Sequence, residues 1–278
     1  MPSESTGGKC GAVLVVGGTG VAGGAAIAAV REEFGPAPDI TALWYGPRRE
    51  DLSIRGANRS LYGDITAEET CRLITEAAGG SFDYLFFATA RGEVGFPIVD
   101  STPASLTEAC RFSYDPLLTL EEYFSVGTIV GYSTFYTLEH QKVNYGAMGY
   151  AKEKIELWAA RDGKSRHTCL RAGAFASDSS RAIKLMLRKH ARHISSSSHP
   201  LLRSYFSGRR PSEAVALLEK GIMTEEKERY GDSGTTPEDL IRAHRELLRR
   251  PGAPFVNVCG RRIWFSEEPQ RLPPPAGL

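Results

Sequence analysis

Over the first 175 residues, short apolar segments alternate with helical stretches, and this alternation limits the possible folds more than any other feature. The run from Val13 to Val16 is apolar at every position, as expected for a strand that is covered on both faces. Strands that are joined by helices run parallel within one sheet. The sequence therefore predicts an α/β fold of the Rossmann type, with a doubly wound parallel sheet.

Periodicity and turn residues place the individual elements. Strands are expected at residues 12–16, 40–45, 58–62, 84–88, 128–132, 167–171 and 255–259. Helices are expected at residues 21–34, 67–78, 145–160 and 237–249. We expect a single domain of residues 1–278, because this length is within the range of one large α/β domain.

Residues 176–236 interrupt the alternation. The segment is too long for an ordinary connection, which in such folds has about 2–6 residues. It contains a basic amphipathic helical pattern near residues 181–193, a serine run at residues 195–198 and a second helical pattern near residues 211–220. We expect this helical insertion to cover the substrate cleft. The proline-rich tail, residues 270–278, is expected to be disordered.

The composition argues against several classes of protein. With 41% hydrophobic and 24% charged residues, the chain is an ordinary globular protein with a sizeable core. A formal net charge of +1 gives no general attraction to nucleic acid or to a membrane, and no apolar run approaches the ~20 residues of a membrane span. The five cysteines form no CxxC pair, so we expect no disulfide framework and no metal site. The polar N-terminus does not resemble a secretory signal, and we expect a cytoplasmic protein.

A glycine-rich loop follows the first expected strand. It satisfies G-x-G-x-x-G at Gly18, Gly20 and Gly23, between a strand and a helix. Glycines let the backbone turn tightly and approach a pyrophosphate, and the helix N-terminus supplies free N–H groups. We expect a dinucleotide here, and the alternative is a tight turn without a ligand. The candidate cofactor residues are Gly17, Gly18, Thr19, Gly20, Val21 and Gly23.

The end of the second expected strand indicates which dinucleotide would bind. NAD-binding proteins usually place an acid there for the ribose hydroxyls, but Asp39 precedes the strand. Arg48 and Arg49 follow the strand instead, and arginine suits the 2′-phosphate of NADP. NADP is therefore favoured over NAD. Alternatively, the two arginines are solvated loop residues.

Two Tyr–Lys pairs overlap at the start of the expected helix 145–160. Tyr150 and Lys154 have the spacing Tyr-x-x-x-Lys, and Tyr145 and Lys152 have the spacing Tyr-x6-Lys. The residues three and seven positions after the lysine should pack inward with it. Both are apolar after Lys152, and only one is apolar after Lys154. The helix face therefore favours Lys152.

Along most of its length the chain resembles the short-chain dehydrogenase/reductase superfamily. Its glycine loop has the G-x-x-G-x-x-G spacing of the superfamily, and Asp64 with Ile65 stands where members contact adenine. The residues after the fourth strand, which include Ala88, Thr89 and Ala90, replace the usual Asn-Asn-Ala-Gly and are a departure from the pattern. The resemblance implies an NAD(P)-dependent oxidoreductase that forms a homodimer or homotetramer.

Ordinary members of the superfamily reduce ketones with a Tyr-x-x-x-Lys pair, which Tyr150 and Lys154 match. In such a site, Ser133 or Thr134 would polarise the carbonyl group. The tyrosine would protonate the alkoxide, and the lysine would hold the nicotinamide ribose and lower the tyrosine pKa.

The segment also resembles the enoyl-acyl-carrier-protein reductases, a divergent branch with a Tyr-x6-Lys pair. Tyr145 and Lys152 match this pair, within a longer run of similar residues from Asn144 to Glu156. An aromatic residue replaces the catalytic serine in that branch, and Phe135 and Tyr136 stand at the corresponding position as candidate pocket residues. The tyrosine would then donate a hydrogen bond to the oxygen of an enolate.

Three functions remain open at this point. An NADPH-dependent enoyl reductase that acts on an acyl thioester is favoured, ahead of a ketoreductase. A non-catalytic NAD(P)-binding sensor or scaffold is the alternative from another class.

The insertion has a basic character of its own. From residue 179 to residue 212 it contains no acid and eight basic residues, namely Arg181, Lys184, Arg188, Lys189, Arg192, Arg203, Arg209 and Arg210. Such residues could bind the phosphates of coenzyme A or a phosphopantetheine arm, or an acidic carrier protein. Alternatively, they form a solvated helix face. Nucleic acid is not expected as a partner, because the rest of the chain is charge-balanced.

Overall fold

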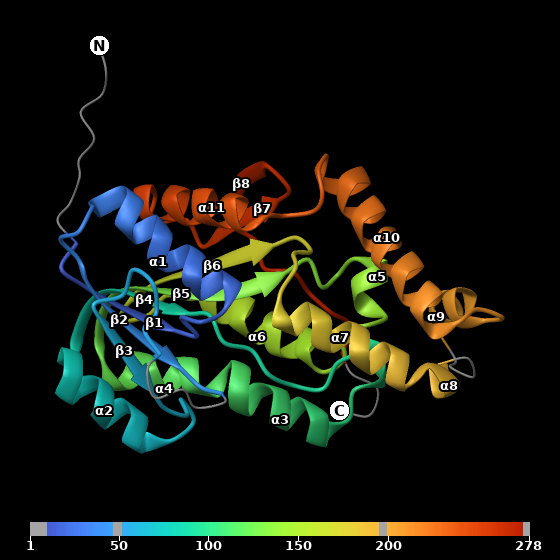
Figure 1. Ribbon diagram of the computed structural model, residues 1–278, viewed down its shortest axis with the longest axis horizontal. Helices are drawn as coiled ribbons and strands as arrows, with labels where there is room; N and C mark the ends of the chain where they lie inside the picture. Colours follow the sequence, from blue (N-terminus) through green and yellow to red (C-terminus); the bar gives the residue numbers. More distant parts are fainter. Residues whose placement is uncertain (1–9, 47–51, 195–198, 275–278) are drawn as a thin grey trace, which may run out of the picture.

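The computed structural model describes residues 10–46, 52–194 and 199–274, and these residues form one eight-stranded sheet with helices on both faces (Figure 1). The strands are β1 (Ala12–Val16), β2 (Asp39–Trp44), β3 (Arg59–Tyr62), β4 (Ser81–Phe87), β5 (Ser125–Thr134), β6 (Arg166–Ala172), β7 (Phe255–Cys259) and β8 (Arg262–Ser266). Their order is β3-β2-β1-β4-β5-β6-β7-β8, and all neighbouring pairs are parallel except β7 with β8. The predicted Rossmann-type sheet is confirmed.

Two apolar layers enclose the sheet. On one face, α1 (Val21–Phe34) and α11 (Pro237–Arg249) pack side by side and share a core with Val13, Phe86 and Val256 (Figure 1). On the other face, α2 (Glu68–Ala78), α4 (Asp115–Tyr123) and α6 (Met148–Ala159) cover Leu14 and Ile129. A loop with the short helix η1 (Ile98–Asp100), followed by α3 (Pro103–Ser113), connects β4 to α4. Burial on both faces explains why the central strand β1 is apolar throughout, whereas the edge strand β3, which has no buried residue, is not.

The chain moves outward from β1 to β3 and then returns to β4, on the other side of β1. The strand order therefore reverses between β1 and β4. In open α/β sheets, the crevice at the carboxyl ends of the strands beside such a reversal is where ligands bind. The fold thus directs attention to the ends of β1, β4, β5 and β6.

The insertion lies between β6 and α11, on the right-hand side of Figure 1. It contains α7 (Asp178–Lys189), α8 (Ala191–Ile194), α9 (Pro200–Phe206) and α10 (Pro211–Tyr230). Leu187, Leu202, Phe206 and Leu218 form a separate apolar cluster that also includes Val143. The helix expected at 211–220 continues to Tyr230, where a left-handed glycine ends it. The predicted serine run, residues 195–198, lies outside the described residues.

Two further elements differ from the predictions. β8 was not predicted; it pairs with β7 across a two-residue turn in which Gly260 has a φ of 55°. Helix α6 begins at Met148 instead of residue 145, because Gly146 has a φ of 51° and cannot continue a helix. Tyr145 therefore lies in the turn before α6, after the short helix α5 (Glu139–Lys142). Within the described ranges, no helix is both long enough and apolar enough to cross a membrane.

Candidate functional site

A cavity of about 540 Å³ lies at the carboxyl ends of β1, β4, β5 and β6. The sheet side of the cavity is formed by residues 19–22, 88–90, 132–134 and 172–175, together with Gln141, Asn144, Tyr145 and Lys152. Residues 176–181, which lead into and begin α7, line it from the insertion. The insertion contributes a mostly apolar wall of Ile183, Lys184, Leu187, Val215, Leu218, Glu219, Ile222 and Met223. That the insertion covers a substrate cleft stays a prediction.

The glycine loop has a shape that side chains would prevent. Gly17 has a φ of 87°, and its carbonyl oxygen accepts a hydrogen bond from Gly20 N at 3.0 Å. A Cβ atom on Gly23 would lie only 2.3 Å from the same oxygen. Gly20 precedes α1 and no side chain caps this helix, so its first N–H groups are available to an anion. Thr19, Gly20 and Val21 line the cavity, whereas Gly17, Gly18 and Gly23 only shape the loop.

The other predicted cofactor residues are distributed unevenly. Ala88, Thr89 and Ala90 line the cavity. Asp64 and Ile65 do not line the cavity. The Oδ1 atom of Asp64 instead accepts hydrogen bonds from the backbone N and the hydroxyl of Thr66, at 3.0 and 2.8 Å. The arginines predicted to bind a 2′-phosphate, Arg48 and Arg49, lie outside the described residues.

The cavity brings Tyr145 and Lys152 together in one lining. Lys152 is 5% exposed, and its Nζ donates to the carbonyl oxygen of Tyr132 at 2.9 Å. Burial lowers the pKa of Lys152 to about 8. Burial also raises the pKa of Tyr145 to about 12, so the expected lowering of the tyrosine pKa by lysine is not present in this structure. Tyr145 is consequently protonated at neutral pH and can donate a hydrogen bond.

Tyr150 and Lys154 lie elsewhere. The Tyr150 hydroxyl donates to Pro273 O at 3.0 Å, and its ring packs against Ile98. Lys154 is exposed, with its Nζ 5.7 Å from the centre of the Tyr114 ring. Neither residue lines the cavity. The reason is helical geometry, because two residues correspond to about 200° of rotation and place positions 152 and 154 on nearly opposite sides of α6.

The two candidate hydroxyl groups line the cavity, but their protons are already used. Ser133 Oγ donates to Glu156 Oε1 at 2.6 Å, and Thr134 Oγ1 donates to Ala172 O at 2.8 Å. A hydroxyl group has only one proton to donate. In this arrangement, neither Ser133 nor Thr134 can also donate to a substrate carbonyl.

Phe135 and Tyr136, predicted as pocket residues, do not line the cavity. The Phe135 ring packs 4.2 Å from the Tyr230 ring and 5.7 Å from the Trp264 ring, measured between ring centres. The Tyr136 hydroxyl donates to Gln270 O at 2.9 Å. Phe135 contacts α10 and β8, and Tyr136 contacts the C-terminal segment. These partners are distant in the sequence, so the local sequence could not reveal the contacts.

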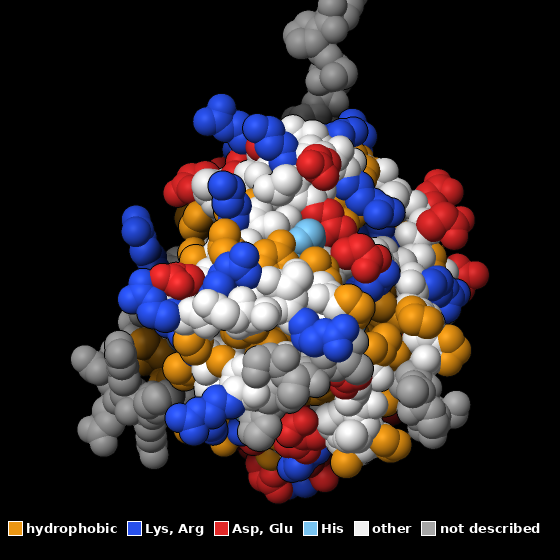
Figure 2. All heavy atoms as spheres, turned by 90° about the vertical axis from the view of Figure 1, so that its right-hand side faces the viewer, with side chains coloured by type: hydrophobic (Ala, Val, Ile, Leu, Met, Phe, Trp, Pro, Cys, Tyr) orange, Lys and Arg blue, Asp and Glu red, His pale blue; other side chains and the backbone are white. Residues whose placement is uncertain are grey.

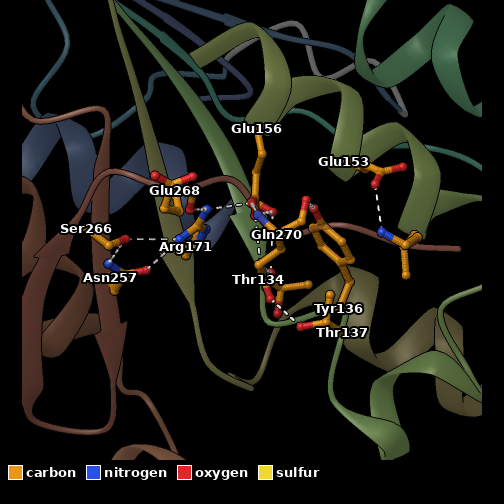
Figure 3. Close-up of polar contacts among 12 residues, drawn as sticks. Thr134, Tyr136, Thr137, Glu153, Glu156, Arg171, Asn257, Ser266, Glu268 and Gln270 are labelled. Atoms are coloured by element: carbon orange, nitrogen blue, oxygen red, sulfur yellow. Dashed lines mark hydrogen bonds and ion pairs between the residues drawn. The ribbon is translucent and has the colours of Figure 1, made fainter. Parts of the chain in front are cut away.

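Behind the cavity lies a buried polar cluster around Glu156 (Figure 3). Glu156 forms an ion pair with Arg171 at 2.6 Å, and both side chains are almost completely buried. Its carboxylate also accepts from Gln270 N at 2.7 Å and from Gln270 Nε2 at 2.8 Å. Of the tail that was predicted to be disordered, residues 270–274 are described, and Gln270 is bonded through its backbone and its side chain. Residues 275–278 lie outside the described part.

The basic residues of the insertion do not form one uniform surface. Arg181 and Lys184 line the cavity, but they pair with Asp178 and Glu219, which lie outside the acid-free run. Arg210 pairs with Glu213, a third acid beyond the run. Figure 2 shows the face on this side of the molecule, where Lys and Arg side chains are scattered among acidic and apolar ones. These three residues therefore each have an acidic partner within the chain, and anion binding by the insertion stays a prediction.

The strand order and the cavity beside its reversal define a Rossmann-type α/β protein. No protein-family model and no curated protein matches the sequence. Among solved structures, the fold is that of short-chain dehydrogenase/reductase proteins. A short chain dehydrogenase family protein from Francisella tularensis is 13% identical, with a TM-score of 0.60 over 91% of this chain and 98% of that one. A putative 2-deoxy-d-gluconate 3-dehydrogenase from Agrobacterium tumefaciens, with bound NADP, is 16% identical, with a TM-score of 0.57 over 94% and 98%. The ligand-free aldohexose dehydrogenase of Thermoplasma acidophilum is 14% identical, with a TM-score of 0.56 over 90% and 93%.

Proposed function

We propose that the protein is an NADPH-dependent oxidoreductase that reduces the carbon–carbon double bond of an enoyl thioester. The observation that carries the proposal is the cavity lining, which includes Tyr145 and Lys152 and leaves out Tyr150 and Lys154. The fold, shared with dehydrogenases and reductases, supports the general reaction class.

The residues present fit a dinucleotide. The loop from Gly17 to Gly23 excludes side chains where a pyrophosphate would approach, and the uncapped start of α1 faces the cavity. Thr89 and its neighbours would contact the nucleoside, and Lys152 would hold the nicotinamide ribose. The NADP found in the Agrobacterium structure supports a nicotinamide cofactor. Arg48 and Arg49 are proposed to select NADP over NAD.

The bound cofactor would supply the hydride. The protein's own contribution is to stabilise the negative charge that develops on the thioester oxygen. Tyr145 would donate a hydrogen bond to this oxygen, and its raised pKa keeps the proton in place at neutral pH. Reduction of a ketone would gain from a second hydroxyl donor, but Ser133 and Thr134 donate into the protein. Their hydrogen bonds favour the enoyl substrate over the ketone.

The apolar wall of the insertion suits an acyl chain. Leu187, Val215 and Leu218 contribute to it, and Ile222 and Met223 extend it. Arg181 and Lys184 lie at the same side of the cavity and are proposed to meet the phosphates of a coenzyme A or phosphopantetheine arm. Binding there would have to compete with the ion pairs to Asp178 and Glu219.

The test is NADPH oxidation with paired thioesters, crotonyl-coenzyme A and acetoacetyl-coenzyme A. We expect turnover of the enoyl compound, with a strong loss in Tyr145→Phe and Lys152→Met. The matched variants Tyr150→Phe and Lys154→Met should remain active. Activity toward the β-keto compound that depends on Tyr150 and Lys154 would instead identify a ketoreductase. NADPH binding without turnover of either thioester would favour a sensor or scaffold.

A further inference from the structure

Gln141 is a buried polar residue whose side chain has no assigned task. It lies on α5, is 5% exposed and lines the cavity. Within the described ranges, no hydrogen bond or ion pair involves its side-chain amide. The neighbouring Asn144 differs, because its Nδ2 donates to His140 O at 2.7 Å. The Gln141 amide is not among the enclosed side-chain atoms without a partner, so it is open to the cavity, where water or a ligand can bond to it.

The backbone ties Gln141 to the proposed catalytic tyrosine. The carbonyl oxygen of Gln141 accepts from Asn144 N and from Tyr145 N, both at 3.1 Å. The two cavity-lining side chains at positions 141 and 145 are thus held on one compact turn.

The helix that carries Gln141 is itself anchored from the opposite wall. Glu225 of α10 accepts from Glu139 N at 2.7 Å and from His140 N at 3.0 Å. The carboxylate thereby satisfies N–H groups at the start of α5, which a helix of this length leaves unbonded. Such an anchor fixes the direction of the helix, and a fixed support is what a substrate-binding donor requires.

The other donors near the cavity end of β5 are already used. Ser133 and Thr134 donate to protein oxygens. Lys152 gives one N–H to Tyr132 O, and its other donors are proposed to bind the nicotinamide ribose. The Tyr145 hydroxyl and the Gln141 amide remain, as neither makes a side-chain hydrogen bond to another described residue. An amide offers two N–H donors without bringing a charge into the apolar cavity.

We propose that Gln141 Nε2 is the second hydrogen-bond donor to the acyl oxygen of the substrate, beside the Tyr145 hydroxyl. This assignment rests on the proposed function. Two fixed donors on one oxygen stabilise a developing enolate more than a single donor does. Gln141 then takes the place of the hydroxyl that Ser133 and Thr134 cannot offer.

The test compares Gln141→Leu, Gln141→Glu and the control Lys142→Met. Lys142 is on the same helix, and its ammonium group pairs with Glu139 near the surface. Loss of one such donor is worth about 100-fold in kcat. We expect Gln141→Leu to lower kcat/KM with crotonyl-coenzyme A by about this factor, while NADPH affinity and Tm stay close to those of the control. In Gln141→Glu, activity should rise as the pH falls, because the protonated carboxyl group regains a donor.

A binding measurement separates this proposal from the proposed function. Butyryl-coenzyme A, which has the same acyl oxygen, is titrated calorimetrically into the NADP complex of each variant. Weaker binding to Gln141→Leu than to wild type supports the assignment, even if no thioester is reduced and the reductase proposal fails. Equal binding and equal kcat/KM for both proteins overturn it. A wild-type protein that binds no thioester overturns both proposals.

Discussion

Replacing Glu156 by glutamine should be among the most destabilising single changes in this chain. Its carboxylate accepts from Arg171 Nη2 and Ser133 Oγ at 2.6 Å each, and from two nitrogen atoms of Gln270 at 2.7 and 2.8 Å. The side chain is fully buried, so water cannot replace these partners. In Glu156→Gln, Arg171 would keep its charge without a counter-charge.

The magnitude follows from the buried ion pair. Removing one partner of such a pair costs about 3–5 kcal/mol, because the remaining charge stays buried. The hydrogen bonds to the same oxygen atoms belong to this loss and are not added to it. We therefore expect a decrease of about 4 kcal/mol in the free energy of unfolding. For a chain of this size, that corresponds to a decrease in Tm of roughly 8–16 °C.

Urea denaturation and thermal unfolding would measure the effect, with Glu139→Gln as the matched control. Glu139 pairs with Lys142 at the surface, and such pairs contribute at most about 1 kcal/mol. Removing the charge of Arg171 as well should restore part of the lost stability. The double variant Glu156→Leu with Arg171→Met should therefore be more stable than Glu156→Leu alone. If Glu156→Gln loses no more stability than the control, the buried ion pair does not stabilise the fold.

Three further predictions concern the loop, a buried histidine and the lysine. Gly23→Ala should abolish NADPH binding, since its Cβ would lie 2.3 Å from a backbone oxygen; the control Gly24→Ala, with no atom within 4 Å, should bind normally in the same fluorescence titration. Burial lowers the pKa of His244 to about 4. As the pH is lowered, the unfolded state therefore binds a proton before the folded state does, and the free energy of unfolding should decrease from about pH 6.5 to pH 4. Up to about 3 kcal/mol would be lost, and urea titrations of His244→Phe should show a shallower pH dependence. Burial lowers the pKa of Lys152 to about 8, so its charge is lost above that pH; kcat/KM for NADPH should decline there, and Lys152→Met should lack this decline.

Much of the fold could be predicted because its signals are local. All seven predicted strands are present. The signal is strongest for β1 and β7, which are buried along nearly their whole length and are almost entirely apolar. The glycine loop could also be recognised, because its backbone shape restricts residue type at fixed spacing. The unpredicted strand β8 is an edge strand with mixed residues, as is the predicted β3 at the other edge, so the local signal at the two edges is not decisive.

The predictions about the site depended on more distant contacts. The sequence contained both Tyr–Lys pairs, and periodicity favoured Lys152 only slightly. It could not show that the Tyr150 hydroxyl donates a hydrogen bond to Pro273 O, or that Gln141 lines the cavity. No motif singles out Gln141, and only its burial beside the cavity draws attention to it.

By itself, the sequence determined the parallel sheet, the glycine loop and the short list of residues that could do chemistry. These follow from periodicity and backbone sterics, which act over a few neighbouring residues. The tertiary structure decided which of those residues share a cavity and which protons are free. Glu156 and Gln270, 114 residues apart, are hydrogen-bonded behind the site, and Glu156 also accepts the proton of Ser133. Hydrogen bonds of this kind depend on where the folded chain brings distant groups together, which local periodicity does not specify.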